Sequence, residues 1–288
     1  MNLDLQRIQT EDFWKELCPQ LSISNEPLAE RSDWGQSRPL DSDSWATCQQ
    51  TIAQDGYFAY DSWFDERQID RMAKCFHQLD ANGIHPVFAF VYDEFWDLLM
   101  QIDPLFSDLL DDYECLPAVW SWFVQPKNQT AFSPHRDQVR EVDIEDEEHL
   151  DYLTIWIPLT DLNHLSSAIC VLPASLDPNY ESCTAEIQVD NLQDVRTLQG
   201  KRGSVFCWTT QLAHWGTRQS SHGPPRMSVG YYLKRTEAEN LEEQDALDFT
   251  EPLSLRQRLS IIGQQIQNYS RSASEEELQF AEALTDLA

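Results

Sequence analysis

The sequence predicts a mainly β fold with flanking helices, arranged as a β-sandwich or jelly roll. Six short runs of β-branched and aromatic residues follow one another, and Pro, Gly, Asn or Asp interrupts the chain between them. Apolar residues at helical spacing come before and after this series. Such a succession of short strands is typical of sandwiches and jelly rolls. The predicted strands are 119–125, 152–158, 168–173, 204–208, 212–215 and 227–233.

The chain before these strands is expected to form helices that support one face of the sandwich. After the first short helix, a stretch rich in Ser, Asn, Pro and Asp predicts an irregular arm up to about residue 40. The helices are indicated by N-cap residues, apolar residues three or four apart, and Asp-Gly or Asn-Gly pairs at their ends. They are predicted over 11–18, 42–54, 65–79, 93–99 and 104–110.

The chain after the strands is acidic and rich in Gln, and it predicts two helices. The first carries Leu255, Leu259, Ile262, Ile266 and Tyr269 on one face, and the second covers about 275–287. We expect the first to pack on the core, although a dimer contact or a cover over the active site would also fit. A length of 288 residues suits a single domain. Its parts are about 1–115 (helical support), about 116–235 (jelly-roll core) and about 236–288 (C-terminal helices).

Composition restricts the partners and the compartment. The 49 acidic and 20 basic residues give a formal charge of −29, which repels nucleic acid. The same charge would attract a cationic substrate, but solubility explains it as well.

Seven scattered cysteines without a Cys-x-x-Cys pair are typical of reduced thiols and do not predict structural zinc. With no apolar run long enough to span a bilayer, we expect a cytoplasmic protein without a membrane partner. The oligomeric state is left open.

Three residues have the spacing of a metal site. His135 and Asp137 are two residues apart in the stretch after the first strand, and His214 lies on a later strand. Two histidines and one carboxylate form the facial triad of non-haem Fe(II) oxygenases, which leaves coordination positions open for a co-substrate and O2. The other candidate histidines, at 149, 164 and 222, lie in polar connections or turns, so His214 is the preferred distal ligand.

Arg226 is the candidate anchor for a co-substrate. It comes twelve residues after His214 and directly before the run 227–233, which is apolar enough to be a buried strand. An unpaired arginine would be costly there, so a buried anion is its simplest partner. The far carboxylate of 2-oxoglutarate would meet this requirement through a bidentate pair.

The order of further motifs extends this pattern to about residues 45–235. The motifs are Thr51-Ile-Ala-Gln-Asp-Gly-Tyr57, Pro134-His-Arg-Asp137, Trp156-Ile-Pro-Leu159, Val171-Leu-Pro-Ala-Ser175 and Gly203-Ser-Val-Phe206, followed by His214 and Arg226. In this order the chain resembles the phytanoyl-CoA dioxygenase-like branch of the Fe(II)/2-oxoglutarate oxygenases. The resemblance implies a double-stranded β-helix in which His135, Asp137 and His214 bind iron and Arg226 binds 2-oxoglutarate. It also implies that Trp156 lines the co-substrate pocket.

The chain departs from this family at several positions. Leu176 stands where a histidine often ends the Pro-Gly-Ser-His motif, and Gly216 replaces a hydroxyl residue that some members use to hold the co-substrate. Ser228, on the same strand face as Arg226, is the candidate for that hydroxyl. Gln125 and Phe132 are further candidate pocket residues. The acidic stretch 141–151 matches no family pattern, and the loop 136–148 could be a lid or a solvated loop.

The expected reaction is hydroxylation of an unactivated C–H bond in a small molecule, such as an amino acid derivative or a secondary metabolite. By resemblance, Fe(II), 2-oxoglutarate and O2 take part, and succinate and CO2 are released. Asp137 argues against halogenation, because related halogenases lack this carboxylate, whereas desaturation, cyclisation and epoxidation stay open. Two alternatives remain at this point: a cupin-type metalloenzyme independent of 2-oxoglutarate, and a non-catalytic β-sandwich binding protein.

Overall fold

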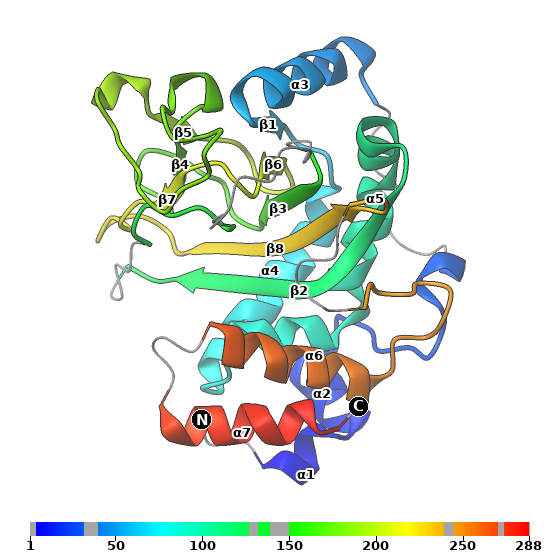
Figure 1. Ribbon diagram of the computed structural model, residues 1–288. Helices are drawn as coiled ribbons and strands as arrows, with labels where there is room; N and C mark the ends of the chain where they lie inside the picture. Colours follow the sequence, from blue (N-terminus) through cyan, green and yellow to red (C-terminus); the bar gives the residue numbers. More distant parts are fainter. Residues whose placement is uncertain are drawn as a thin grey trace.

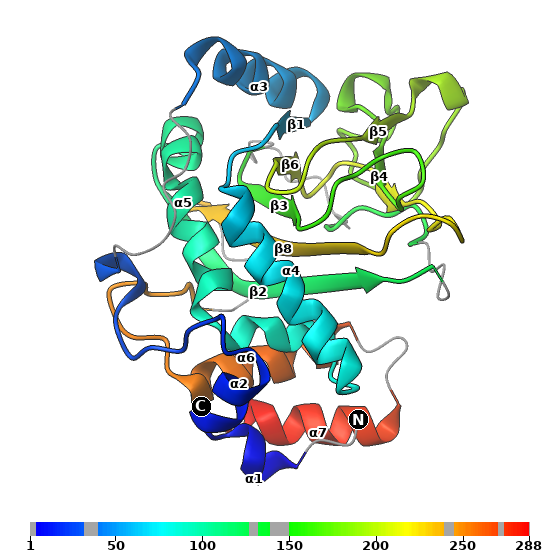
Figure 2. The same cartoon turned by 180° about the vertical axis from the view of Figure 1, so that it is seen from behind.

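The computed structural model describes residues 4–31, 40–126, 132–138, 150–238, 245–269 and 274–287. Two antiparallel sheets lie opposite each other, and most of the helices cover the outer side of the larger sheet (Figures 1 and 2). This is the jelly-roll arrangement with flanking helices that the sequence predicts. None of the helices in the described ranges is long and apolar enough to cross a membrane.

The larger sheet has five strands. Its order is β1-β6-β3-β8-β2. Thr154 of β3 is paired with Trp208 of β6 on one side and with Tyr232 of β8 on the other, so these three side chains point to the same face. The strands are β1 (Tyr57–Tyr60), β6 (Val205–Thr209), β3 (Tyr152–Pro158), β8 (Arg226–Arg235) and β2 (Tyr113–Val124).

The smaller sheet has the order β5-β4-β7. Its strands are β5 (Arg196–Leu198), β4 (Ile169–Val171) and β7 (His214–Gly216). His135 extends it by an isolated antiparallel bridge to His214. In this bridge the His135 N–H donates to the His214 carbonyl at 3.0 Å, and the His214 N–H donates to the His135 carbonyl at 2.9 Å. The two histidines are therefore held together by their backbones.

The two faces of β2 have different surroundings. Trp120 and Trp122 point between the two sheets and line an interior cavity, whereas Phe123 points outward against Phe76. A Cβ atom at Gly230, which lies opposite Trp120, would come within 2.9 Å of the Trp122 ring. Glycine at this position therefore makes room for the indole that lines the cavity.

The helices form from the capping signals present in the sequence. α3 ends at Gly56, which has a positive φ of 76°, and α4 begins after Asp65, whose carboxylate accepts two backbone N–H groups. The N-terminal helices are α1 (Leu5–Ile8), α2 (Glu11–Leu17), η1 (Leu28–Glu30) and α3 (Ser42–Asp55). Next come α4 (Glu66–Ala81), η2 (Pro86–Val91) and α5 (Asp93–Leu110). The others are η3 (Ala174–Leu176), η4 (Leu192–Asp194), α6 (Leu255–Asn268) and α7 (Glu275–Thr285).

The structure corrects one helix prediction and adds two strands. The helices predicted over 93–99 and 104–110 are a single helix, α5, which continues through Pro104. Ile102 and Leu105, on either side of the proline, are fully buried, and this packing offsets the hydrogen bond that proline cannot donate. β1 and β5 were not predicted, and β2 begins at Tyr113, six residues before the predicted strand.

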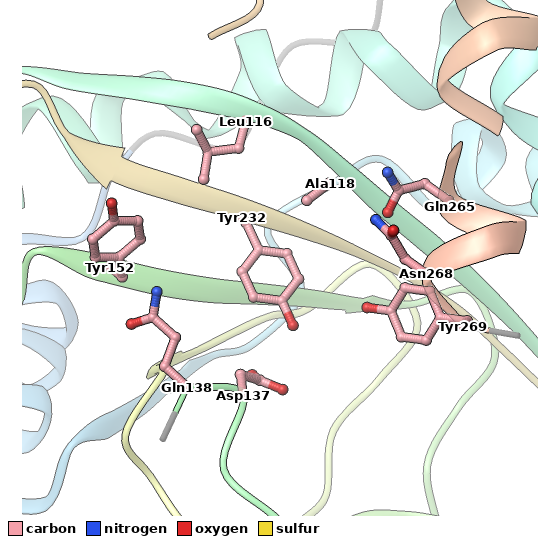
Figure 3. Close-up of a pocket in the computed structure, with 9 residues that line it drawn as sticks. All are labelled: Leu116, Ala118, Asp137, Gln138, Tyr152, Tyr232, Gln265, Asn268 and Tyr269. Atoms are coloured by element: carbon pink, nitrogen blue, oxygen red, sulfur yellow. The ribbon is translucent and has the colours of Figure 1, made fainter. Parts of the chain in front are cut away.

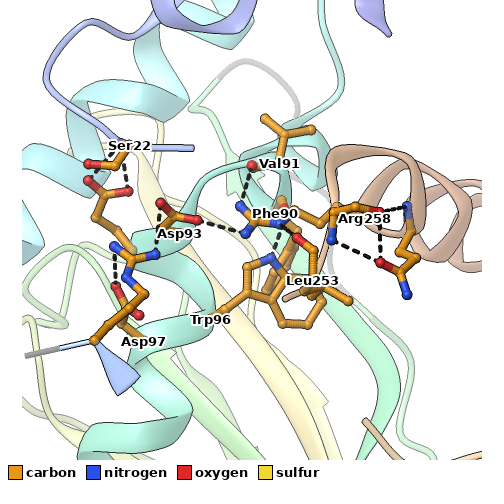
Figure 4. A network of polar contacts seen from close by, with 12 residues as sticks. Ser22, Phe90, Val91, Asp93, Trp96, Asp97, Leu253 and Arg258 are labelled. Carbon is orange, nitrogen blue, oxygen red and sulfur yellow. Dashed lines mark hydrogen bonds and ion pairs between the residues drawn. The ribbon is translucent and has the colours of Figure 1, made fainter. Parts of the chain in front are cut away.

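A buried ionic network connects the N-terminal arm, α5 and α6 (Figure 4). Asp93 pairs with both Arg31 and Arg258 at 2.7 Å, and Arg31 also approaches Asp97 at 3.4 Å. Arg258 donates further hydrogen bonds to the Val91 and Leu253 carbonyls. α6 is therefore fixed to α5 by a fully buried arginine.

Candidate metal centre

The structure brings His135, Asp137 and His214 together. One ligand atom from each lies within 4.8 Å of the others. The Nε2 atoms of His135 and His214 face the same oxygen, Asp137 Oδ1, at 3.8 and 3.5 Å, and the ring centroids are 4.3 Å apart. A facial triad consists of two imidazole nitrogens and one carboxylate oxygen that bind one side of a metal ion.

Backbone carbonyls orient both imidazoles for metal binding. His135 Nδ1 lies 2.8 Å from the Ser133 carbonyl, and His214 Nδ1 lies 3.0 Å from the Leu212 carbonyl. A carbonyl only accepts, so each Nδ1 carries the proton and each Nε2 keeps its lone pair for a cation. Burial lowers the pKa of His214, which also favours the neutral ligand form.

Asp137 is held as a ligand through one oxygen. Its Oδ2 accepts a hydrogen bond from Thr154 Oγ1 at 2.6 Å and another from Trp208 Nε1 at 3.1 Å. Its Oδ1 is left to face the two histidines. Thr154 and Trp208 are neighbours across β3 and β6, so the larger sheet fixes the carboxylate.

Arg136 lies between His135 and Asp137 in the sequence and anchors the loop that carries them. Its side chain is fully buried and pairs with Asp177 at 2.8 Å. It also donates to the carbonyls of Thr184 and Gln211 at 2.9 and 2.6 Å. The sequence singled out neither Arg136 nor the pair Thr154 and Trp208.

Arg226 is buried in the same cavity without an anionic partner among the described residues. It is 2% exposed, its Nε and Nη1 atoms have no hydrogen-bond acceptor, and the Trp156 ring lies 5.6 Å from its Cζ. Burial lowers its pKa to about 10, so it is still charged at neutral pH. The buried Trp156 Nε1 and Ser228 Oγ also lack partners. These unpaired donors fit a ligand that carries a carboxylate.

Two adjacent cavities meet at Asp137. The first, of about 70 Å³, contains the three ligand residues, Arg226 and Trp156. The second, of about 420 Å³, adjoins it at Asp137 and is walled by β2, β3, β8 and α6 (Figure 3). Tyr232 and Tyr269 line both cavities, and Tyr269 stacks on Trp120 with centroids 4.2 Å apart.

The remaining expectations for pocket residues have different outcomes. Phe132 lines the smaller cavity, at the rim beside His135. Ser228 lies buried on β8 between two cavity residues but is not itself part of the lining. Gln125 follows the end of β2 and does not line this cavity. The loop considered as a lid lies largely outside the described residues, since 139–149 are not among them.

The family assignment follows from a direct match. The profile of the phytanoyl-CoA dioxygenase (PhyH) family matches residues 59–228, which is more than half of the chain. The chain belongs to the PhyH family. This match contains all three candidate metal ligands and Arg226, and it confirms the family that the motif order predicts. No curated protein sequence matches the chain.

Several solved structures share the fold of this PhyH-family chain. The epimerase SnoN in complex with Fe3+, alpha ketoglutarate and nogalamycin RO superposes with a TM-score of 0.53 at 14% identity, over 72% of this chain and 97% of that chain. The carbocyclase SnoK from nogalamycin biosynthesis gives 0.53 at 14% identity, over 75% and 97%. The non-heme monooxygenase ThoJ gives 0.55 at 14% identity, over 77% and 99%. At these identities the similarity establishes the fold.

Proposed function

We propose that this PhyH-family protein is an Fe(II)- and 2-oxoglutarate-dependent oxygenase that hydroxylates an unactivated C–H bond of a small molecule. The observation that carries the proposal is the combination, in one cavity, of the facial triad with a buried and unpaired Arg226. A triad alone would suit many metalloenzymes, but an unpaired buried cation requires an anionic ligand as well.

Each group has a distinct role in this proposal. His135, Asp137 and His214 would hold Fe(II), and Arg226 would bind the far carboxylate of 2-oxoglutarate, with the Trp156 indole as a wall and second donor. Ser228 remains the candidate hydroxyl for the same carboxylate, because its Oγ is buried without a partner. Iron, 2-oxoglutarate and O2 together supply the oxidising power, with succinate and CO2 as the co-products.

The protein contributes the orientation of the ligand groups. The Nδ1 contacts hold the two imidazoles in the ligand tautomer, and Thr154 and Trp208 bind one oxygen of Asp137, which would leave the other oxygen for the metal. Asp137 supports hydroxylation over halogenation, because the carboxylate occupies the position that a halide would need. Superposable proteins are described as an epimerase and a carbocyclase, so stereochemical inversion or ring closure would be the alternative outcomes.

The deciding experiment is an anaerobic titration of metal-free protein with Fe(II) and then 2-oxoglutarate, followed by the weak visible charge-transfer band of the chelate. We expect the band in the parent protein, its loss in His135→Ala, and a large rise in the 2-oxoglutarate concentration needed in Arg226→Ala. Arg202→Ala is the matched control, since Arg202 is a partly exposed arginine paired with Glu66 and Asp70.

The other outcomes identify the alternative functions. Iron binding without the band, or a band indifferent to Arg226→Ala, would favour a metalloenzyme that does not use 2-oxoglutarate. Failure to bind iron at all would favour a non-catalytic binding protein. If the band forms as expected, succinate release in the presence of candidate substrates, with mass spectrometry of the products, separates hydroxylation from epimerisation and cyclisation.

A further inference from the structure

The larger cavity differs in chemistry from the one that holds Arg226. It has a volume of about 420 Å³, which lies within the range of small-molecule sites. Three tyrosines line it, at 152, 232 and 269, together with three side-chain amides, Gln138, Gln265 and Asn268 (Figure 3). Hydroxyls and amides both donate and accept hydrogen bonds, so this wall matches hydroxyl and carbonyl groups of a ligand.

We propose that this cavity is the substrate site and that it takes an uncharged molecule bearing hydroxyl or carbonyl groups and an apolar part, rather than an acyl-CoA thioester. This inference rests on the proposed function. The cavity shares Asp137 with the metal centre, so a molecule bound there would have one end beside the metal. Leu116 and Ala118 provide the apolar part of the wall.

The charges around the cavity disfavour an anionic substrate. None of its described lining residues is basic, and Asp137 is acidic. The nearby Lys234, opposite Tyr152 in the sheet, is buried and already pairs with Glu114 at 3.0 Å. The thioester of coenzyme A carries several phosphate charges, which the formal charge of −29 would also repel.

The wall contributed by α6 is held in place by contacts outside the cavity. Gln265 is 1% exposed, and its Nε2 donates to the Pro117 carbonyl of β2 at 2.9 Å. Tyr269 is fixed by its stacking on Trp120. The polar groups are therefore preorganised, which favours recognition of a specific uncharged ligand.

A cysteine placed in the cavity would report on its occupancy. All seven native cysteines are buried, so Ala118→Cys would introduce a uniquely reactive thiol. Ala53→Cys on the exposed face of α3 is the matched control. If Ala118→Cys does not fold, Asn268→Cys, at an exposed position of the same wall, replaces it. The variants are loaded with Fe(II) and 2-oxoglutarate without O2, and alkylation by iodoacetamide is timed by mass spectrometry.

Three probes distinguish the classes of ligand: phenyl β-D-glucopyranoside, its charged counterpart phenyl β-D-glucuronide, and palmitoyl-CoA. We expect the glucopyranoside to protect the thiol of the Ala118→Cys variant at a concentration about tenfold lower than the glucuronide. Palmitoyl-CoA should not protect, and the control position should be unaffected by all three. Protection by palmitoyl-CoA at a lower concentration than the neutral glycoside, or no protection by any probe, would overturn the inference.

The co-substrate provides a further check. Fe(II) and 2-oxoglutarate alone should leave the cysteine reactive, because they occupy the other cavity, and protection by 2-oxoglutarate alone would also reject the substrate assignment. The chelate band distinguishes failure of the substrate inference from failure of the proposed function. If it forms and depends on Arg226 while the probes fail, the substrate inference alone is wrong. If it does not form, the proposed function is wrong.

Discussion

At the scale of single residues, the contacts around Asp137 decide how well the centre binds a metal. Its two oxygens have different contacts. Oδ2 accepts hydrogen bonds from Thr154 and Trp208, whereas Oδ1 faces the histidines. A carboxylate that lost these donors could rotate and present either oxygen. The hydrogen bonds behind a ligand are therefore part of the metal site, although they do not touch the metal.

Thr154→Val tests this role. Valine keeps the size and the β-branched shape of threonine but cannot donate, so we expect Fe(II) affinity to fall about 10- to 100-fold with little change in fold. Thr154→Ser, which restores the hydroxyl, should recover most of the affinity. Anaerobic equilibrium titration with Fe(II) measures both. Equal affinities for the valine and serine variants would show that the hydroxyl does not orient Asp137.

Arg226 allows function and stability to be separated. Because its guanidinium is buried and has no anionic partner in the described chain, the folded protein gains little from its charge. We expect Arg226→Met to leave the melting temperature unchanged or raise it, while binding of 2-oxoglutarate is lost. Thermal unfolding of the metal-free protein and the chelate band are the two measurements. A large drop in melting temperature would instead indicate a structural role for the arginine.

The clustering of His135, Asp137 and His214 and the burial of Arg226 could be predicted from the sequence, because the order and spacing of these residues are typical of one kind of site. Thr154 and Trp208 could not, since their contact with Asp137 depends on the register of β3 against β6. Strand alternation did place Trp120 and Trp122 on one face, but it could not tell which face was inside. Gln125 was a candidate pocket residue, and it is not part of the cavity lining.

At the scale of elements, a buried ionic network joins α6 to α5. Arg258 of α6 is fully buried and is paired with Asp93 of α5 at 2.7 Å. The same helix carries Gln265 into the wall of the larger cavity. α6 thus extends from an ionic anchor in the helical layer to the proposed substrate site.

Arg258→Met should destabilise the protein by about 3–5 kcal/mol, because it leaves Asp93 and neighbouring carboxylates buried with one cation fewer. Arg256→Met, two residues away on the exposed side of the same helix, is the control and should change the stability little. Urea unfolding monitored by tryptophan fluorescence measures both variants. If the two lose equal stability, the buried pair does not hold α6.

Some boundaries of helices and strands are determined by tertiary packing and not by the local sequence pattern. Pro104 predicted an interruption, but the buried residues around it keep α5 continuous. β5 was missed because its three residues are mostly exposed and lack an alternating pattern. In contrast, Gly56 ended α3 as predicted, because its left-handed conformation is a local property of glycine.

At the scale of the whole molecule, buried acids in a strongly acidic chain give stability a distinct pH dependence. Burial raises the pKa of Glu94 to about 7 and that of Asp97 to about 8, despite the attraction of Asp97 to Arg31. Between the ordinary pKa values near 4 and these raised values, the folded protein binds more protons than the unfolded chain. Stability should therefore decrease as the pH rises from about 5 to about 8 and level off above.

Asp97→Asn tests this directly. Asparagine cannot ionise, so the variant should show a weaker decrease in unfolding free energy over the same pH range. Asp80→Asn, at an exposed position of α4, should retain the parent slope and corrects for the change in net charge. Urea unfolding at several pH values provides the comparison. Parallel curves for all three proteins would mean that Asp97 does not change its protonation in this range.

The reciprocal backbone hydrogen bonds between His135 and His214 bear on which ion the protein acquires. They place the two imidazoles before any ion arrives, so binding requires little rearrangement of the main chain. A preformed site of two nitrogens and one oxygen follows the general affinity order of divalent ions, in which nickel, copper and zinc exceed iron. The protein itself would then discriminate poorly, and correct loading would be determined by the concentrations of free ions in the cell.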